Sequence, residues 1–123
     1  VSEATYADAR RARTQFAVAV DAALAEFGVL ALPTTPTTAP LLYQTISQID
    51  GNEVNTRAAL LSLTSPWNMT GSPAISIPGG ELNGLPFGIQ LITSPGNEAT
   101  LFATAALLEH TTAAQETKCP PSK

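Results

Sequence analysis

The chain has 123 residues, six basic and ten acidic residues, and a formal net charge of −4 at pH 7. This length fits one domain, and the acidic balance argues against a nucleic-acid binder, because that affinity rests on many Lys and Arg side chains. Only 13% of the residues are charged, about half the usual share, which suggests a surface that other protein covers.

The first predicted element is an amphipathic helix over residues 2–27, in which apolar residues recur at helical spacing. Ser2 can cap its N-terminus, and Gly28 can end it. Three of the six basic residues share this helix: Arg10, Arg11 and Arg13. We interpret them as a solvated helix face rather than a binding patch.

Residues 29–32, VLAL, are apolar throughout, which predicts a short strand covered on both faces. The following PTTPTTAP, residues 33–40, cannot form a central strand or a helix, because its three prolines lack a backbone N–H and have a fixed φ. We therefore predict a loop that leaves the carboxyl end of a strand, where α/β sheets place ligand sites.

The next part of the chain is less regular. Residues 41–50 indicate no single structure, and Asp50-Gly51-Asn52 is typical of a turn. Residues 53–63 predict a second helix, which Ser65-Pro66 would end, because the residue before a proline disfavours the helical conformation.

The stretch NMTGSPAISIPGGELNGLPFGIQLI, residues 68–92, contains two apolar runs with a period of two. Two glycine-containing pairs between the runs predict antiparallel strands joined by a loop of several residues. One face would carry the large apolar side chains of Ile75, Ile77, Phe87, Ile89 and Leu91. The other face would stay small or polar, with Ala74, Ser76, Gly88 and Gln90, so that another element can approach closely.

Asn97 can cap a last helix that runs to about His110, and residues 112–123 are predicted to be a flexible tail. His110 is the only histidine and Cys119 the only cysteine, so the chain cannot supply the three or four ligands of a zinc site. No base accompanies Ser76. We predict no catalytic residue, no cofactor and no metal in this chain.

The lone cysteine excludes an internal disulfide framework and favours a reducing compartment, so we expect a cytoplasmic protein. The uncharged stretch at residues 27–49 is interrupted by prolines well short of the roughly 20 apolar residues that a membrane span requires. The sequence therefore predicts no membrane span.

Three motifs occur in order: PTTP at residues 33–36, N-x-x-G-x-P-A-x-S-x-P-x-G at 68–80, and G-L-P-x-G-x-Q-L at 84–91. Together they resemble the C-terminal portion of the amidase signature family, and the resemblance covers residues 1–111. The family consists of serine hydrolases that cleave amide bonds through a Ser, cis-Ser and Lys triad. The resemblance implies an α/β fold, as part of an α/β/α sandwich with a mixed sheet, here a few strands flanked by helices.

The family's glycine- and serine-rich segment, which holds the nucleophile and the cis-serine, has no counterpart here, nor has the lysine upstream of it. The resemblance thus implies a fragment of a longer amidase that is inactive by itself. Its partner would be the remainder of the amidase domain, or a homo-oligomer covering the exposed sheet face, and the full enzyme would take a small-molecule amide. A non-catalytic binding module derived from the same framework, or an unrelated small α/β domain, is the alternative.

In the family, the loop after the first strand and the loop before N-x-x-G help to form the wall of the acyl pocket. The resemblance therefore makes Thr34, Thr35, Trp67 and Asn68 the candidates for lining or bracing this pocket. Trp67 could instead be an ordinary core aromatic residue, and Asn68 could hydrogen-bond the backbone of the turn at Gly71.

Overall fold

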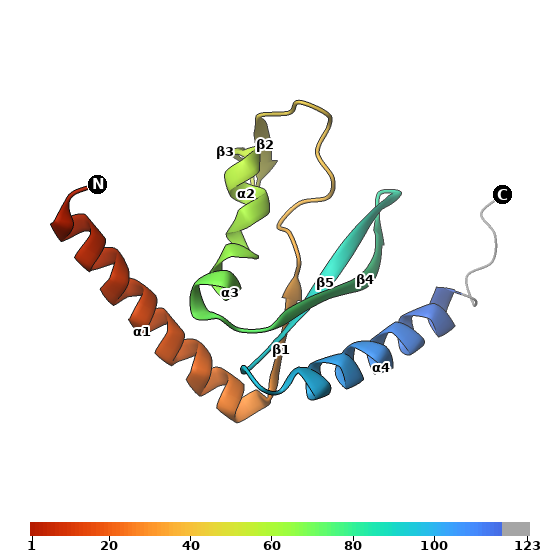
Figure 1. Ribbon diagram of the computed structural model, residues 1–123. Helices are drawn as coiled ribbons and strands as arrows, with labels where there is room; N and C mark the ends of the chain where they lie inside the picture. Colours follow the sequence, from red (N-terminus) through yellow and green to blue (C-terminus); the bar gives the residue numbers. More distant parts are fainter. Residues whose placement is uncertain (117–123) are drawn as a thin grey trace.

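The structure is a computed structural model that describes residues 1–116 (Figure 1). Its elements are, in chain order, α1 (Glu3–Phe27), β1 (Val29–Pro33), β2 (Ile46–Ile49), β3 (Asn52–Asn55), α2 (Thr56–Ser62), α3 (Ser65–Thr70), β4 (Ala74–Leu82), β5 (Leu85–Thr93) and α4 (Glu98–Glu116). Strands flanked by helices confirm the α/β class, and every strand pairing within these residues is antiparallel.

Helix α1 begins and ends where its capping residues predict. The Ser2 hydroxyl accepts a hydrogen bond from the backbone N–H of Thr5 at 3.1 Å. Gly28 has a φ of 77°, which costs glycine little, and donates its N–H to the carbonyl of Leu24 at 2.9 Å. Only Val20 and Leu24 of this helix are buried, and its N-terminal part extends away from the sheet (Figure 1).

The main sheet has the strand order β1-β5-β4, with β5 in the centre. β4 and β5 form the predicted antiparallel hairpin, but the turn has only two residues, Asn83 and Gly84, rather than several. Both have positive φ, 54° and 75°, the conformation that twists a hairpin in the favoured sense. Gly79-Gly80 stays inside β4, where the register shifts between Pro78 and Gly80.

The two faces of the hairpin differ as the period of two predicts. Ile75 lies opposite Leu91 and Ile77 opposite Ile89, and their side chains share the face that α4 covers. The buried core between this face and the helix consists of Ile77, Leu91, Leu101 and Ala105. Ser76 lies opposite Gln90 on the other face, where no such core forms among the described residues.

The prediction for residues 53–63 was wrong at its N-terminal end, whereas α2 does end beside Leu63, its C-terminal cap. Residues 53–55 belong to β3, which pairs with β2 across a turn at Asp50 and Gly51, so tertiary pairing overrides the helical pattern here. α2 begins only after Asn55, whose side chain accepts a hydrogen bond from the N–H of Ala58 at 3.0 Å. The helix ends before Ser65-Pro66 as predicted, but Pro66 also lies in the first turn of α3, a helix that was not predicted, because the first helical turn needs no N–H from proline.

Two further expectations differ from the structure. β1 is only partly buried, so within residues 1–116 it is not covered on both faces as its apolar sequence predicts. α4 continues to Glu116, and His110 therefore lies inside the helix rather than at its end. Residues 117–123 of the predicted tail, with Cys119, lie outside the described residues.

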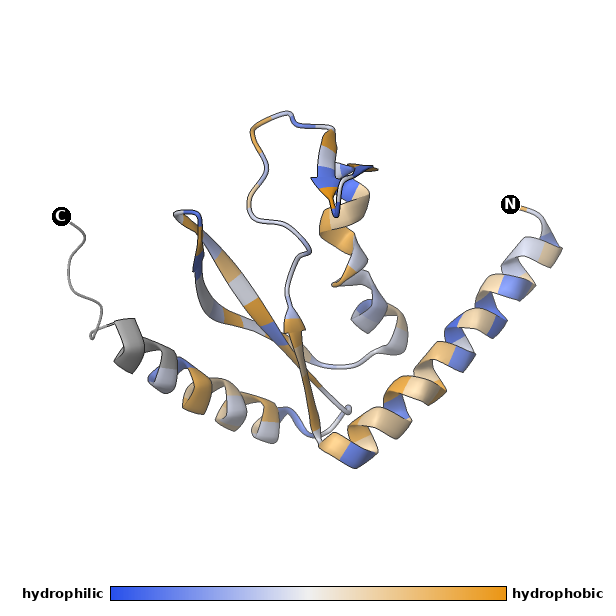
Figure 2. Ribbon diagram, turned by 180° about the vertical axis from the view of Figure 1, so that it is seen from behind, coloured by the Kyte–Doolittle hydropathy of each residue, from blue (hydrophilic) through white to orange (hydrophobic). Residues whose placement is uncertain are grey.

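The fold exposes an unusual amount of surface. The chain has an accessible area of 8918 Å², whereas a compact folded protein of this mass exposes about 6,300 Å². Figure 2 shows apolar residues spread along α1, most of which extends away from the sheet, and along α4. Large exposed apolar side chains include Val18, Phe27, Leu41, Leu42, Tyr43, Leu82, Phe102 and Leu107. No helix within the described range is long and apolar enough to cross a bilayer.

Candidate functional site

A cavity of about 260 Å³ lies over the small-residue face of the hairpin, opposite the face that α4 covers. Its walls are the chain that leaves β1, the connection between α2 and α3, the helix α3, and the strands β4 and β5. Polar residues predominate in its lining: Thr34, Thr64, Asn68, Ser72, Ser76 and Gln90. We call it the hydroxyl-lined cavity.

Two hydroxyl groups meet at one side of this cavity. The Oγ1 atom of Thr34 and the Oγ atom of Ser76 are 2.6 Å apart, and either can be the donor. Gly88 lies beside both residues and accepts the backbone N–H of Thr34 through its carbonyl at 2.9 Å. A Cβ atom on Gly88 would come within 2.6 Å of the Ser76 hydroxyl and 2.7 Å of the Thr34 hydroxyl, so the pair requires a glycine here.

Gln90 lies at the base of the same cavity, and this residue is only 3% exposed. Its Nε2 group donates to the carbonyl of Pro33 at 3.1 Å and to the carbonyl of Leu63 at 2.8 Å. Gln90 is the glutamine of the motif G-L-P-x-G-x-Q-L, and the strand period predicts it on the small face, but it was not among the predicted site residues. A buried amide between two apolar strand residues, which must find hydrogen-bond partners, is the signal for its role.

Trp67 and Asn68, both on α3, contribute to the lining. The Trp67 ring is tilted by 38° against the ring of Phe16 on α1, with centroids 6.4 Å apart. Its indole Nε1 is buried and has no hydrogen-bond partner within the described part of the chain. The turn after α3 is closed by the backbone, since the Trp67 carbonyl accepts the N–H of Gly71 at 2.9 Å.

Thr35 lies apart from the other three predicted site residues. It borders a separate cavity of about 290 Å³ that Pro33, Pro36, Leu82 and Phe87 help to line. The Thr35 hydroxyl donates to the carbonyl of Thr37 at 2.7 Å, which stabilises the loop itself. The structure thus brings Thr34, Trp67 and Asn68 together around one cavity and places Thr35 beside another.

The hydroxyl-lined cavity offers hydrogen bonds rather than acid–base chemistry. The Ser76 hydroxyl contacts the Thr34 hydroxyl, which cannot take its proton as a general base would. His110 belongs to α4, which packs on the opposite face of the sheet. Among the described residues no group of three or more His, Cys, Asp and Glu side chains could hold a metal ion.

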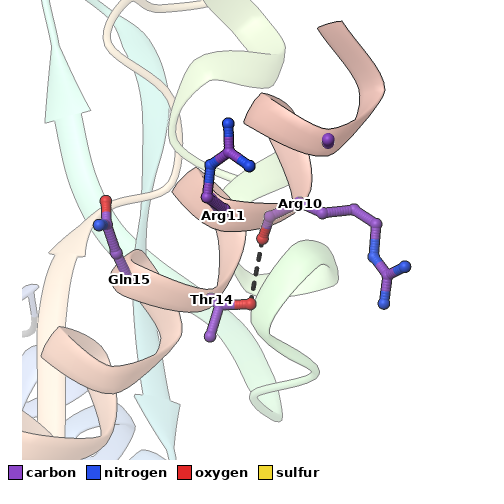
Figure 3. Close-up of a pocket in the computed structure, with 5 residues that line it drawn as sticks. Arg10, Arg11, Thr14 and Gln15 are labelled. Carbon is purple, nitrogen blue, oxygen red and sulfur yellow. Dashed lines mark hydrogen bonds between the residues drawn. The ribbon is translucent and has the colours of Figure 1, made fainter. Parts of the chain in front are cut away.

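A second hollow, of about 430 Å³, runs along the outer surface of α1 (Figure 3). Its two arginines do not converge on one point, since Arg10 and Arg11 extend in different directions (Figure 3). Arg11 forms an ion pair with Asp8, and the Arg10 guanidinium lies 5.9 Å from the centre of the Tyr6 ring. Local contacts of this kind fit a solvated helix face.

Comparison with known proteins places these features in a family. The sequence profile described as Amidase matches residues 1–102. The chain is 37% identical to the A subunit of the glutamyl-tRNA(Gln) amidotransferase of Lysinibacillus sphaericus, over 89% of this chain and 22% of that protein. It is 32% identical to AtzE, the 1-carboxybiuret hydrolase component of Pseudomonas sp. strain ADP, over 88% of this chain and 24% of that one.

The fold agrees with the sequence. The crystal structure of an amidase superposes with a TM-score of 0.83 and 27% identity, over 90% of this chain and 26% of the amidase. The chain thus spans about a quarter or less of the length of the proteins that it matches. The motifs, the sequence comparisons and the structural match agree, and the chain belongs to the amidase signature family.

Proposed function

We propose that this chain is the C-terminal portion of an amide hydrolase, and that the Ser, cis-Ser and Lys residues of the reaction lie in the rest of a longer protein. The match to hydrolase and amidotransferase relatives covers almost nine tenths of this chain but less than a quarter of theirs. That difference in coverage is the observation on which the proposal rests.

The contribution of this chain would be one wall of the substrate cavity. Thr34, Trp67 and Asn68 gather around the hydroxyl-lined cavity, together with the hydroxyl of Ser76. Hydroxyl and amide groups can orient the polar part of a small amide by hydrogen bonds. Thr35 would act by stabilising the loop that carries Thr34.

The partner would be the remainder of the amidase domain, or a second copy of the chain, lying against the apolar surface that the fold leaves open. Leu82, Leu85 and Phe87 near the tip of the hairpin are part of that surface. Burial of such side chains stabilises an assembly by about 1.5–3 kcal/mol each. We also propose a cytoplasmic location, which fractionation of source cells would test.

The first experiment is to read the coding sequence upstream of Val1. We expect a reading frame of several hundred residues with a glycine- and serine-rich segment and a lysine upstream of it. The longer protein should then hydrolyse simple amides, and the 123-residue chain alone should not. A longer protein without that segment would overturn the proposal and favour a binding module, and amide turnover by the isolated chain would also overturn it.

A further inference from the structure

We infer that Gln90 is a positioning residue, which holds the two walls of the hydroxyl-lined cavity at a fixed separation. This inference rests on the proposed function, because the walls matter only if a substrate lies between them. Gln90 itself needs no contact with the substrate.

A glutamine amide has two N–H donors, and both are used here. One N–H points to the carbonyl of Pro33, the residue before Thr34, and the other to the carbonyl of Leu63, the residue before Thr64. Thr34 and Thr64 lie on different walls of the cavity. One side chain therefore joins the end of β1 to the connection between α2 and α3, two segments that are far apart in the sequence.

The setting of Gln90 makes this connection rigid. It belongs to β5, the central strand of the sheet, and lies between the paired residues Leu32 on β1 and Ser76 on β4. The neighbouring strand residues Leu91 and Ile92 are fully buried in the sheet. The amide therefore extends from the central strand to the end of β1 and to the connection between α2 and α3.

The bond to Leu63 links the sheet directly to the connection between α2 and α3. Without the amide, the carbonyl of Leu63 would lose a bond that keeps the start of α3 close to the sheet. Since α3 carries Trp67 and Asn68, the width of the cavity, and with it the size of the accepted acyl group, would depend on Gln90.

Gln90→Met tests this, because methionine has nearly the same shape and neither donor. Gln48→Met is the matched control, since Gln48 is an exposed residue of β2 outside the cavity. The first measurement is amide hydrogen exchange in the 123-residue chain. We expect exchange in residues 63–72 to accelerate about tenfold in Gln90→Met, with little change in residues 98–108 and none in the control.

The second measurement uses the longer protein and amides of increasing acyl length, from acetamide to hexanamide. We expect Gln90→Met to raise KM for the short amides about tenfold, to change kcat much less, and to weaken the preference between short and long amides. Unchanged exchange in residues 63–72 would overturn the inference, as would acceleration that is equal throughout the chain. A longer protein that hydrolyses no amide would refute the proposed function, while the exchange experiment would still decide the role of Gln90.

Discussion

The hydroxyls of Thr34 and Ser76 lie 2.6 Å apart, although 42 residues separate them in the sequence. Their contact joins the loop after β1 to the strand β4, across the backbone of the intervening strand β5. Gly88 on β5 makes the contact possible, because any larger residue would fill the space that the two hydroxyls occupy.

Gly88→Ala should therefore displace both hydroxyls and destabilise the chain. The new Cβ would lie 2.6 Å from the Ser76 hydroxyl, so we expect a loss of about 1–3 kcal/mol in the free energy of unfolding. Urea unfolding measures this loss. The triple variant with Thr34→Ala and Ser76→Ala provides the control, since removing the two hydroxyl oxygens should restore most of the stability. A Gly88→Ala chain as stable as the parent would contradict the geometry.

Helix α1 should depend on Arg13 for its contact with α3. The Arg13 Nε donates to the Met69 carbonyl in the last turn of α3 at 2.6 Å, where a cation also suits the helix dipole. Arg13→Met should cost about 1 kcal/mol in unfolding free energy and shift the emission of the lone Trp67 to longer wavelength.

Arg11→Met is the control for that variant. Arg11 pairs with Asp8 on the exposed surface of the same helix, and such pairs contribute about 0–1 kcal/mol. Its Trp67 emission should match that of the unchanged chain. Equal emission shifts in the two variants would indicate that Arg13 has no special role in docking α1.

Two leucines of α4 provide a matched test of the core. Leu101 is 3% exposed and packs on the hairpin, whereas Leu107 is 66% exposed. Leu101→Ala should cost about 2–5 kcal/mol in unfolding free energy, because it leaves a cavity in the core. Leu107→Ala should cost less than about 0.5 kcal/mol in the same chain. If the two variants lost similar amounts of unfolding free energy, α4 could not pack on the hairpin in the way that the structure shows.

The isolated chain should associate with itself through its open apolar surface. Leu41, Leu42 and Tyr43 form an exposed run in the connection between β1 and β2, and patches of this kind promote association. We expect oligomers in sedimentation velocity experiments at micromolar concentration. Replacing Leu41 and Leu42 by Asp should reduce association, whereas Glu3→Asp, a change at an exposed polar position, should not. A wild-type chain that sediments as a monomer would count against an open surface.

Much of this fold could be predicted from helix capping and strand periodicity, because both depend only on residues that are close in the sequence. Ser2 and Gly28 at the ends of α1, and the alternation of Ile75 with Ser76, follow from capping and from the period of a strand. The predictions failed where distant pairing decides, since residues 53–55 join β2 rather than continue a helix. The helix before Ser65-Pro66 ends as predicted, but α3 was missed, because a proline that follows one helix can also begin another.

Only some of the residues of the candidate site could be predicted from the sequence. The motifs indicated Thr34, Trp67 and Asn68, which lie around one cavity, and also Thr35, which lies beside another. The contact between Thr34 and Ser76 and the two bonds of Gln90 could not be derived, because each joins segments whose separation only the folded chain determines. The role of Gln90 and the contact between Thr34 and Ser76 are tested by the variants at these positions, and the roles of Thr35, Trp67 and Asn68 stay predictions.

The position of β5 at the centre of the sheet has a consequence for biosynthesis. β4 meets β5 across a two-residue turn, but β1 leaves the ribosome long before β5 is made. A nascent strand without its partner can pair with the wrong chain, and proline beside an apolar strand discourages that error. Pro33 ends β1 and Pro36 lies just beyond it, so we expect them to protect the newly made strand from aggregation until β5 arrives.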